Sequence, residues 1–393
     1  MDRKRTSRIL ENHNLDGLIA TTQENVAWAS GFRTAESRSN YTTQIYAMLP
    51  GDSSQPICLV IPTISLSYVA QLMLPPEQVF TYGEFYFYKD EDADLVDATR
   101  RLSDLLAAKK PYPDGPSALR AALESAGLGS ARVGLDEMGI DPSVYSKLES
   151  EAGCDIVPAY QLLRLLQAVK TPDEIAKLRE ASRIAEAAVE EVIEHMEPGI
   201  THRELVGIYR ASAGQSGAIP THVNFRFGPN SGLPSLLPSD TILARGDLIA
   251  WDVGLIYELY QADTARCAVL GKPTERQATV CEALRAGEQA AIGAIRPGVR
   301  AAEVFRIAVE TVRKNGIADY NRNHCGHGIG VEAYGEPLIA PDDDTILEAG
   351  MAFCIETPYY QLGFGSPVVE DTVVILESGT EYLTHMQREL LVL

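Results

Sequence analysis

Four acidic residues stand inside stretches that are otherwise apolar enough to form buried β-strands. They are Asp252 in IAWDVG, Asp263 in QADTA, Glu356 in FCIET and Glu370 in VVEDTVV. A buried carboxylate is costly unless it is paired or binds a metal ion. Side chains alternate along a strand, so any one of these residues alone could face solvent. Four of them together make that interpretation much weaker and predict a shared polar site.

The spacing of these residues predicts how the strands bring them together. Asp252 and Asp263 are eleven residues apart, and a turn at residues 257–258 would place their carboxylates opposite each other across a hairpin. Directly opposed residues have Cβ atoms about 4.5–5.5 Å apart. Glu356 and Glu370 would pair in the same way across the loop between them. Two adjoining carboxylate pairs would balance two divalent cations and offer the oxygen ligands that Mn²⁺ or Mg²⁺ prefers.

A histidine in a glycine-rich run can complete this ligand set. His327 stands in the sequence NHCGHGIG, residues 323–330. Taken alone, such a run is a flexible turn and its histidine would be structural. The small neighbours nevertheless leave room for a metal ion to approach closely. With an imidazole added, Zn²⁺, Fe²⁺ and Co²⁺ also become suitable ions.

Length and patterning predict two domains. The chain has 393 residues, which is more than one core usually supports. Residues 1–160 are expected to form an α/β domain, because helical and strand patterns alternate there. Its expected helices lie near 3–12 and 94–108, its strands near 17–20, 44–49, 57–61 and 133–136, and a turn-rich break at 111–116. Residues 161–393 are expected to form an α+β domain with antiparallel hairpins.

The second domain carries clear helix starts. Thr171 and Glu174, with Pro172 between them, predict a capping box at the start of a helix that runs to about residue 196. The sequence THRE, residues 201–204, predicts a second capping box. Further elements are expected as helices at 275–295 and 301–315 and as strands at 248–254, 262–270, 352–357 and 368–376.

These motifs together resemble the pita-bread metallopeptidases, the family of prolidase, aminopeptidase P and the related creatinase. The resemblance lies in Asp252 and Asp263, in GHGIG at 326–330, in GMAFCIE at 350–356 and in EDTV at 370–373. It extends to NVAWASGF at 25–32 and KTPDEI at 170–175, and so covers nearly the whole chain. It implies a creatinase/prolidase-like N-terminal domain over 1–160 and a pita-bread catalytic domain over 161–393.

The resemblance also implies a dinuclear metal site and gives each ligand a role. Asp252 would bind one metal ion, Asp263 and Glu370 would bridge both ions, and His327 and Glu356 would hold the second. A water activated between the ions would be the nucleophile. Glu356 would also be catalytic, because it would carry a proton to the leaving nitrogen. The expected cofactor is two manganese ions, with cobalt, zinc or iron as alternatives.

Three positions depart from the peptidases of this family. Ser235 and Tyr334 stand where those peptidases have histidines, and Val368 stands where they usually have an arginine. The two histidines normally hold and polarise the substrate amide. Losing one donor of this kind can slow a reaction about 10²–10³-fold. Other polar groups near the motifs are therefore candidates to replace them.

Several side chains near the motifs are candidates for these lost functions. Tyr334, His324 and His222 are predicted to be catalytic, and Arg226 and Ser235 to bind substrate. Each of them also has a structural interpretation. Tyr334 could pack as an aromatic side chain, His324 could be a loop residue, His222 could lie on a strand face and Arg226 could be a solvated charge.

Two arginines of the first domain are further candidates. Arg33 and Arg38 follow the NVAWASGF motif. Each could bind a substrate carboxylate by bidentate contact, including across a dimer. The alternative is an ordinary surface arginine.

The sequence thus predicts a metal-dependent hydrolase of an amide-like C–N bond, with a Xaa-Pro peptidase as the leading hypothesis. The altered positions favour an alternative, a specialised hydrolase of a modified amino acid or a creatinase-like substrate. A third hypothesis is a non-catalytic binding protein, and the five intact ligands count against it. The resemblance further implies a homodimer.

Charge and composition restrict the partners. The formal net charge is -20, with 54 acidic and 34 basic side chains. Such a field repels phosphate backbones and anionic membranes. We therefore expect a small peptide or amino-acid-derived substrate and no nucleic acid or membrane partner. The basic N-terminus is not followed by an apolar segment and the six cysteines are scattered, so a cytoplasmic location is expected.

Overall fold

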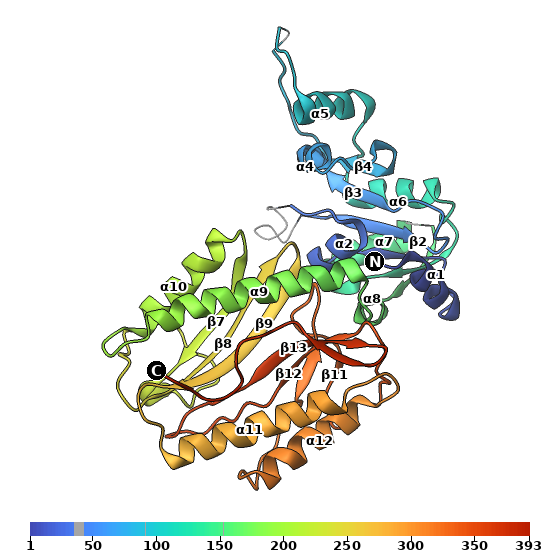
Figure 1. Ribbon diagram of the computed structural model, residues 1–393. Helices are drawn as coiled ribbons and strands as arrows, with labels where there is room; N and C mark the ends of the chain where they lie inside the picture. Colours follow the sequence, from blue (N-terminus) through green and yellow to red (C-terminus); the bar gives the residue numbers. More distant parts are fainter. Residues whose placement is uncertain (35–42, 91, 152) are drawn as a thin grey trace. The chain divides into compact units, whose positions relative to one another are not determined.

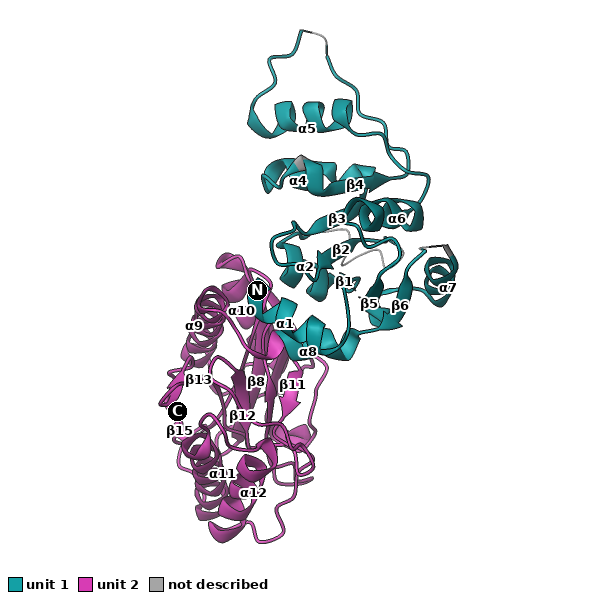
Figure 2. Ribbon diagram, turned by 90° about the vertical axis from the view of Figure 1, so that its right-hand side faces the viewer, with its two compact units in different colours: residues 1–166 teal, residues 167–393 magenta. Residues whose placement is uncertain are grey.

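The described residues fold into two compact units. The computed structural model describes residues 1–34, 43–90, 92–151 and 153–393. Unit 1 comprises Met1–Leu166 and unit 2 comprises Gln167–Leu393 (Figure 2). The division falls inside a helix, α8 (Tyr160–Ala168). The domain boundary between residues 160 and 161 stays a prediction.

The described part of unit 1 is built around a mixed six-stranded sheet. Its strands are β1 (Gly17–Ala20), β2 (Tyr46–Pro50), β3 (Cys58–Pro62), β4 (Val79–Tyr82), β5 (Arg132–Leu135) and β6 (Asp155–Pro158). Their order is β4-β3-β2-β1-β5-β6 (Figure 1). The pairs β1–β2 and β2–β3 are antiparallel, and the pairs β3–β4, β1–β5 and β5–β6 are parallel. Strands and helices alternate as an α/β domain requires, so the predicted fold class is confirmed.

The described part of unit 1 also contains helices. They are α1 (Arg3–Asn12), α2 (Gln23–Ser30), α4 (Leu66–Gln71), α5 (Asp97–Ala108), α6 (Gly115–Ser125), α7 (Pro142–Glu151) and α8, with short 3₁₀ turns at Thr63–Ser65, Pro76–Gln78 and Glu137–Gly139. Of these helices, α6 packs on the sheet and α5 packs on α4. Buried residues of α6 and of the central strands form one apolar cluster, which includes Ile19, Met48, Leu119 and Val133.

Helix α6 begins where the sequence predicted only a turn. The Asp114 carboxylate accepts a hydrogen bond from the Ser117 backbone N–H at 2.9 Å and so caps the helix. Pro116 lies in the first turn, where a missing N–H leaves no hydrogen bond unmade. The proline- and glycine-rich run therefore marks a helix start as well as a break.

Unit 2, whose residues 167–393 are all described, is built around a nine-stranded sheet. Its strands are β7 (Ile219–Arg226), β8 (Leu248–Tyr257), β9 (Tyr260–Val269), β10 (Gly326–Gly328), β11 (Gly335–Leu338), β12 (Ala352–Glu356), β13 (Glu370–Leu376), β14 (Gly379–Tyr382) and β15 (Leu391–Val392). The order is β11-β10-β12-β13-β9-β8-β7, with β14 paired to β13 and β15 to β9. The predicted antiparallel hairpins are therefore present.

Long helices pack on this sheet in two pairs. They are α9 (Pro172–Glu194), α10 (His202–Gln215), α11 (Glu275–Ala294) and α12 (Ala301–Lys314), and a short 3₁₀ turn spans Gly228–Asn230. Both predicted capping boxes are present, at Thr171 with Glu174 and at Thr201 with Glu204. The capping boxes satisfy backbone N–H groups that the first helical turn leaves unpaired.

Packing against the helices determines which face of the sheet carries the polar residues. Trp251 and Val253 of β8 are buried in a cluster with α9 and α10. Phe353 and Ile355 of β12 are buried in a cluster with α11 and α12. Figure 1 shows both helix pairs lying along the sheet. Because side chains alternate along a strand, Asp252 on β8 and Glu356 on β12 point to the opposite face.

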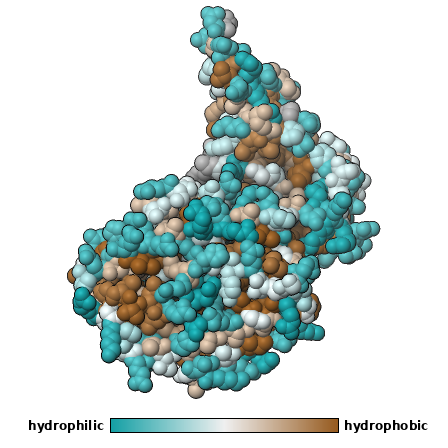
Figure 3. Space-filling view, in the orientation of Figure 1, coloured by the Kyte–Doolittle hydropathy of each residue, from teal (hydrophilic) through white to brown (hydrophobic). Residues whose placement is uncertain are grey.

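The surface mixes polar and apolar residues. On the face drawn in Figure 3, teal hydrophilic residues are interspersed with small brown hydrophobic groups. In the part of the chain that the structure describes, no helix combines the length and the apolar composition needed to cross a bilayer.

Candidate metal centre

Three of the four acidic residues singled out in the sequence lie in one row of paired residues that crosses five strands. Asn224 on β7 pairs with Asp252 on β8, and Asp252 pairs with Ala265 on β9. Ala265 also pairs with Glu370 on β13, and Glu370 pairs with Glu356 on β12. The predicted opposition of Glu356 and Glu370 is confirmed. Since paired residues point to the same face, three carboxylates of the row share one side of the sheet.

The prediction that Asp252 and Asp263 oppose each other is wrong. Tyr257 pairs with Tyr260, so the turn consists of Glu258 and Leu259 and lies one residue later than expected. Asp252 therefore pairs with Ala265, and Asp263 pairs with Gly254. Both turn residues have positive φ, 45° and 80°, as a two-residue hairpin turn of this kind requires. The two aspartates are diagonal neighbours on the same face.

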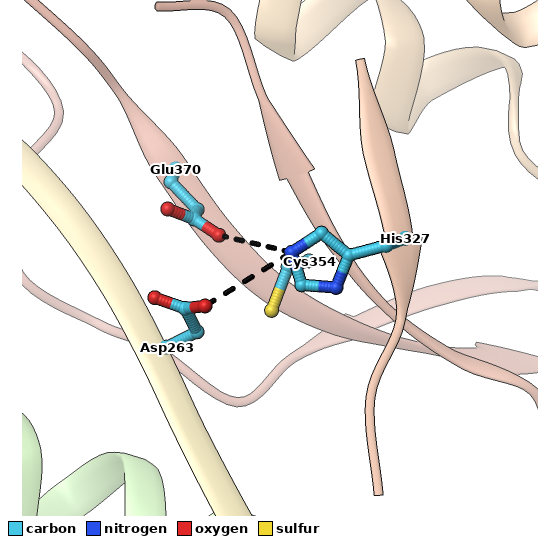
Figure 4. Close-up of side chains that lie close together, drawn as sticks. All are labelled: Asp263, His327, Cys354 and Glu370. Carbon is cyan, nitrogen blue, oxygen red and sulfur yellow. Dashed lines mark ion pairs between the residues drawn. The ribbon is translucent and has the colours of Figure 1, made fainter. Parts of the chain in front are cut away.

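Asp263 forms a compact cluster with residues of three other strands. One ligand atom from each of Asp263, His327, Cys354 and Glu370 can be chosen so that all lie within 4.8 Å of one another, and all four residues are buried (Figure 4). His327 Nε2 lies 4.0 Å from Asp263 Oδ2 and 3.9 Å from Glu370 Oε1.

These spacings suit a metal ion. Two donors that are each about 2.0–2.2 Å from one ion lie roughly 2.8–4.4 Å apart, from right-angled to opposed geometry. The 3.9 and 4.0 Å separations in the cluster fall inside that range. The donor set therefore fits a divalent ion by distance and by chemistry.

Cys354 is the member of this cluster that the sequence did not reveal. It was counted only among the scattered cysteines. It lies on β12 two residues before Glu356, so both side chains point to the same face. Its Sγ lies 3.5 Å from Thr372 Oγ1. Strand alternation around Glu356 was the signal that could have found it.

Burial and mutual repulsion raise the pKa values of two carboxyl groups at this site. Burial raises the pKa of Glu370 well above its ordinary value, and the carboxylates of Asp263 and Glu356 raise it further. Burial also raises the pKa of Glu356 to about 8, although Arg322 opposes this shift from 3.8 Å. Divalent cations would remove this repulsion, so the charge balance also fits a metal centre.

Asp252 contacts one imidazole and one guanidinium. Burial alone would raise its pKa, but His222 and Arg226 outweigh that effect and lower it. His222 Nε2 lies 3.2 Å from Asp252 Oδ1 and 3.0 Å from Asp263 Oδ1. Arg226 Nη1 lies 3.3 Å from Asp252 Oδ2.

Arg226 is a buried residue and not a solvated charge. Its side chain is fully buried, and Nη1 donates a hydrogen bond to Pro234 O at 2.8 Å. Asn224 accepts a hydrogen bond from the Leu236 backbone N–H. The loop that carries the exposed Ser235 is thus tethered on both sides to β7, next to Asp252.

His324 and Tyr334 lie beside the ligand cluster. His324 Nδ1 is 3.2 Å from Glu356 Oε1, and burial together with Arg322 and His327 lowers the pKa of His324 to about 4. Tyr334 stacks on His327, with ring centroids 3.8 Å apart and an interplanar angle of 19°. It is half exposed, so Tyr334 both packs against His327 and reaches solvent.

Three further candidate positions from the sequence are Arg33, Arg38 and Val368. Arg33 belongs to unit 1, where it is exposed and lines a pocket of about 250 Å³ with Thr22 and Thr34. Arg38 lies outside the described residues. Val368 is buried among Leu248 and other apolar residues of β8 and β9. The substrate-binding role of Arg33 stays a prediction.

Comparison with known proteins identifies the family. Residues 176–377 match the model of metallopeptidase family M24, and residues 3–169 match that of the creatinase/prolidase N-terminal domain. The chain belongs to metallopeptidase family M24. This M24 protein is therefore a hydrolase of the metallopeptidase type, and its family implies divalent metal ions. The expected resemblance is confirmed.

Several relatives of this M24 protein are dipeptidases by name. It is 34% identical to the Xaa-Pro dipeptidase of Pyrococcus furiosus over 234 residues, which are 58% of this chain and 67% of that protein. The dipeptidase PepE of Mycobacterium ulcerans superposes with a TM-score of 0.78 at 26% identity, over 99% of this chain and 96% of that one. A Xaa-Pro dipeptidase of Bacillus anthracis superposes with a TM-score of 0.80 over 100% of both chains, and at 20% identity it supports the fold alone.

Proposed function

We propose that this M24 protein binds two divalent metal ions and uses them to hydrolyse Xaa-Pro dipeptides. The observation that carries the proposal is the arrangement of the five residues at one face of the unit 2 sheet. Asp252, Glu370 and Glu356 lie in one row, and Asp263 and His327 lie in the compact cluster beside it.

The positions of these residues support a division between two ions. Asp252 lies at one end of the row, and Glu356 lies at the other. Asp263 and Glu370 lie between them. Asp252 would hold the first ion, His327 and Glu356 would hold the second, and Asp263 and Glu370 would contribute to both. Four carboxylates would balance the charge of two divalent ions.

Bound divalent ions would supply Lewis acidity, which lowers the pKa of water to about 7 in favourable sites and polarises a substrate carbonyl. The side chains would do the remaining work. Glu356 would accept the proton that the attacking water loses. It would then pass this proton to the leaving proline nitrogen. His324, 3.2 Å from Glu356 Oε1, would orient that carboxylate. The phenol O–H of Tyr334 would donate a hydrogen bond to the developing oxyanion.

A Xaa-Pro dipeptide is the substrate that the relatives favour, because the Pyrococcus furiosus protein is named a Xaa-Pro dipeptidase. Ser235 would contact the substrate from the tethered loop beside Asp252. Arg226, which contacts Asp252 directly, would act from behind the ligand by holding both the carboxylate and the loop.

A specialised hydrolase of another small C–N substrate is the second candidate. Val368 favours it, since a buried apolar side chain there cannot supply the arginine that peptidases of this type usually carry. Ser235 and Tyr334 favour it as well, because neither provides an imidazole.

A substrate panel tests both candidates. The purified protein would be loaded with Mn²⁺, Co²⁺ or Zn²⁺ and offered Xaa-Pro dipeptides, longer Xaa-Pro peptides, creatine and N-acyl amino acids. Asp263→Ala is the control that removes a bridging ligand. Metal-dependent cleavage of Xaa-Pro dipeptides that disappears in this variant is the expected result. Two bound metal ions with no Xaa-Pro cleavage would favour the second candidate.

Manganese as the native metal, a homodimer and a cytoplasmic location stay predictions.

A further inference from the structure

His222 lies at an irregularity of strand β7. Pro220 pairs with Leu255 and Val223 pairs with Val253, so Thr221 and His222 together oppose the single residue Gly254. Two residues opposite one define a β-bulge, a feature that often re-aims a side chain beside an active site. The bulge precedes Asn224, and it places His222 on the same face as Asp252.

Gly254 provides the space that the imidazole occupies. A Cβ at this position would overlap His222 Cε1 and would lie 2.7 Å from His222 Nδ1. Gly254 also pairs with Asp263 on the next strand. The imidazole therefore extends over a residue without a side chain and reaches a carboxylate two strands away. Neighbouring strands are about 4.8 Å apart, so only a long side chain over a glycine can make this contact.

His222 Nε2 contacts both Asp252, which belongs to the row of paired residues, and Asp263, which belongs to the compact cluster. It lies 3.2 Å from Asp252 Oδ1 and 3.0 Å from Asp263 Oδ1. Ligand atoms of these three residues lie within 4.8 Å of one another. Two donors that bind one ion at right angles at about 2.1 Å are roughly 3 Å apart, so the two separations from His222 Nε2 have the spacing of neighbouring ligands on one ion.

We propose that His222 is a ligand of the metal ion that Asp252 and Asp263 hold. This proposal rests on the proposed function and adds a sixth protein ligand to it. The first ion would then have a nitrogen ligand from the bulge of β7, as the second ion has one from His327. A nitrogen donor on each ion favours Co²⁺, Zn²⁺ or Fe²⁺ over Mg²⁺ at this centre.

The same distances also suit a hydrogen bond from the imidazole to the two carboxylates. A glutamine at position 222 separates these interpretations, because its amide N–H can donate to a carboxylate but its amide is a poor ligand for these ions. Phenylalanine fills the space and offers neither interaction. His195→Gln, at the exposed end of α9, is the matched control for loss of one histidine.

The experiment uses full-length protein titrated with Co²⁺ in a calorimeter. The same samples, with ¹⁵N-labelled imidazoles, would be examined by proton NMR for the strongly shifted N–H signals of cobalt-bound histidines. The proposal predicts two such signals in the wild type, from His222 and His327. It predicts one signal in His222→Gln and in His222→Phe. One binding step should weaken at least about tenfold in both variants, since even partners of a ligand contribute 10–100-fold.

Each result has a defined meaning. Two signals in His195→Gln and one in both His222 variants support the proposal. A Gly254→Ala variant that loses one signal supports it independently, because the imidazole is then displaced without being replaced. Two Co²⁺ ions bound by the wild type with a single histidine signal would overturn this inference and leave the proposed function standing. Wild-type protein that binds no Co²⁺ would overturn both.

Discussion

Glu356 and Glu370 lie directly opposite each other on the antiparallel strands β12 and β13. Both are buried, with 7% and 3% of their surfaces exposed. Like charges in this position repel each other, and neither residue can turn to solvent without leaving the sheet. The facing pair therefore lowers the stability of the metal-free fold and favours cation binding. A site that binds cations is a reason for a sequence to keep such a pair.

Glu356→Gln should separate these two effects. Without bound metal the variant should be more stable than the wild type at neutral pH, because an amide avoids the cost of burying a carboxyl group whose pKa is raised to about 8. With saturating Mn²⁺ it should gain less stability than the wild type, because a ligand is gone as well. Calorimetric unfolding with EDTA and with Mn²⁺ measures both. An equal gain from Mn²⁺ in the two proteins would show that Glu356 is not a ligand.

Tyr334→Phe should lower kcat about 10²-fold with little change in KM. The ring that stacks on His327 remains, and only the proposed hydrogen-bond donor to the oxyanion is lost. Steady-state kinetics on the substrate identified by the panel measures this split. Unchanged kcat in the phenylalanine variant, with a loss in Tyr334→Ala, would assign Tyr334 to packing alone.

Arg266→Met should destabilise unit 2 by about 1–3 kcal/mol, because it removes one of the two guanidinium partners of the buried Asp371 and leaves buried backbone oxygens unpaired, while Arg388 still contacts Asp371 at 2.6 Å. Arg266 Nη2 lies 2.6 Å from Asp371 Oδ1, and Nη1 donates to the backbone oxygen of Glu370. The Arg266 guanidinium thus holds strand β13 at Glu370, which is a proposed metal ligand. Urea unfolding measures the change in the free energy of unfolding.

The exposed pair of Arg203 with Asp240, at 3.0 Å, provides the control for that measurement. Arg203→Met should cost less than about 1 kcal/mol, since exposed ion pairs contribute little. Equal costs for the two methionine variants would show that burial does not determine the contribution of Arg266.

Asp114 should contribute a pH-dependent part of the stability of unit 1. Hydrogen bonds from Lys147 and Ser117 lower its pKa to about 2 in the folded chain, below the ordinary value of about 3.9. A group with a lowered folded pKa stabilises the fold above its unfolded pKa and loses this contribution as pH falls through the folded value. The advantage of the wild type over Asp114→Asn should therefore be full above about pH 5 and should shrink towards pH 2.

Unfolding of both proteins at several pH values between 7 and 2.5 measures this difference. Lys147→Met should reduce the pH dependence, because the Lys147 ammonium, 2.6 Å from Asp114 Oδ2, is the largest cause of the lowered pKa. A difference between wild type and Asp114→Asn that is constant with pH would contradict the assignment.

Sequence patterns predicted much of unit 2 because their signals are local. The capping box of Thr171 with Glu174 depends on residues within one helical turn, and the structure confirms it. Glu356 and Glu370 were recognised because a charge inside an apolar strand is conspicuous in the sequence itself. Their mutual opposition followed from the loop that joins them, and the structure confirms that pairing too.

The sequence by itself therefore determined the family, the type of fold and the set of acidic residues and histidine that share a face. Tertiary structure alone decided the register of Asp252 and Asp263, the position of Cys354 and the bulge that carries His222. The reason is physical. Glu258 and Leu259 adopt left-handed conformations that their side chains do not signal, and a bulge is defined only by the partner strand. Such shifts of one residue are invisible in a local pattern, yet they decide which atoms meet at the centre.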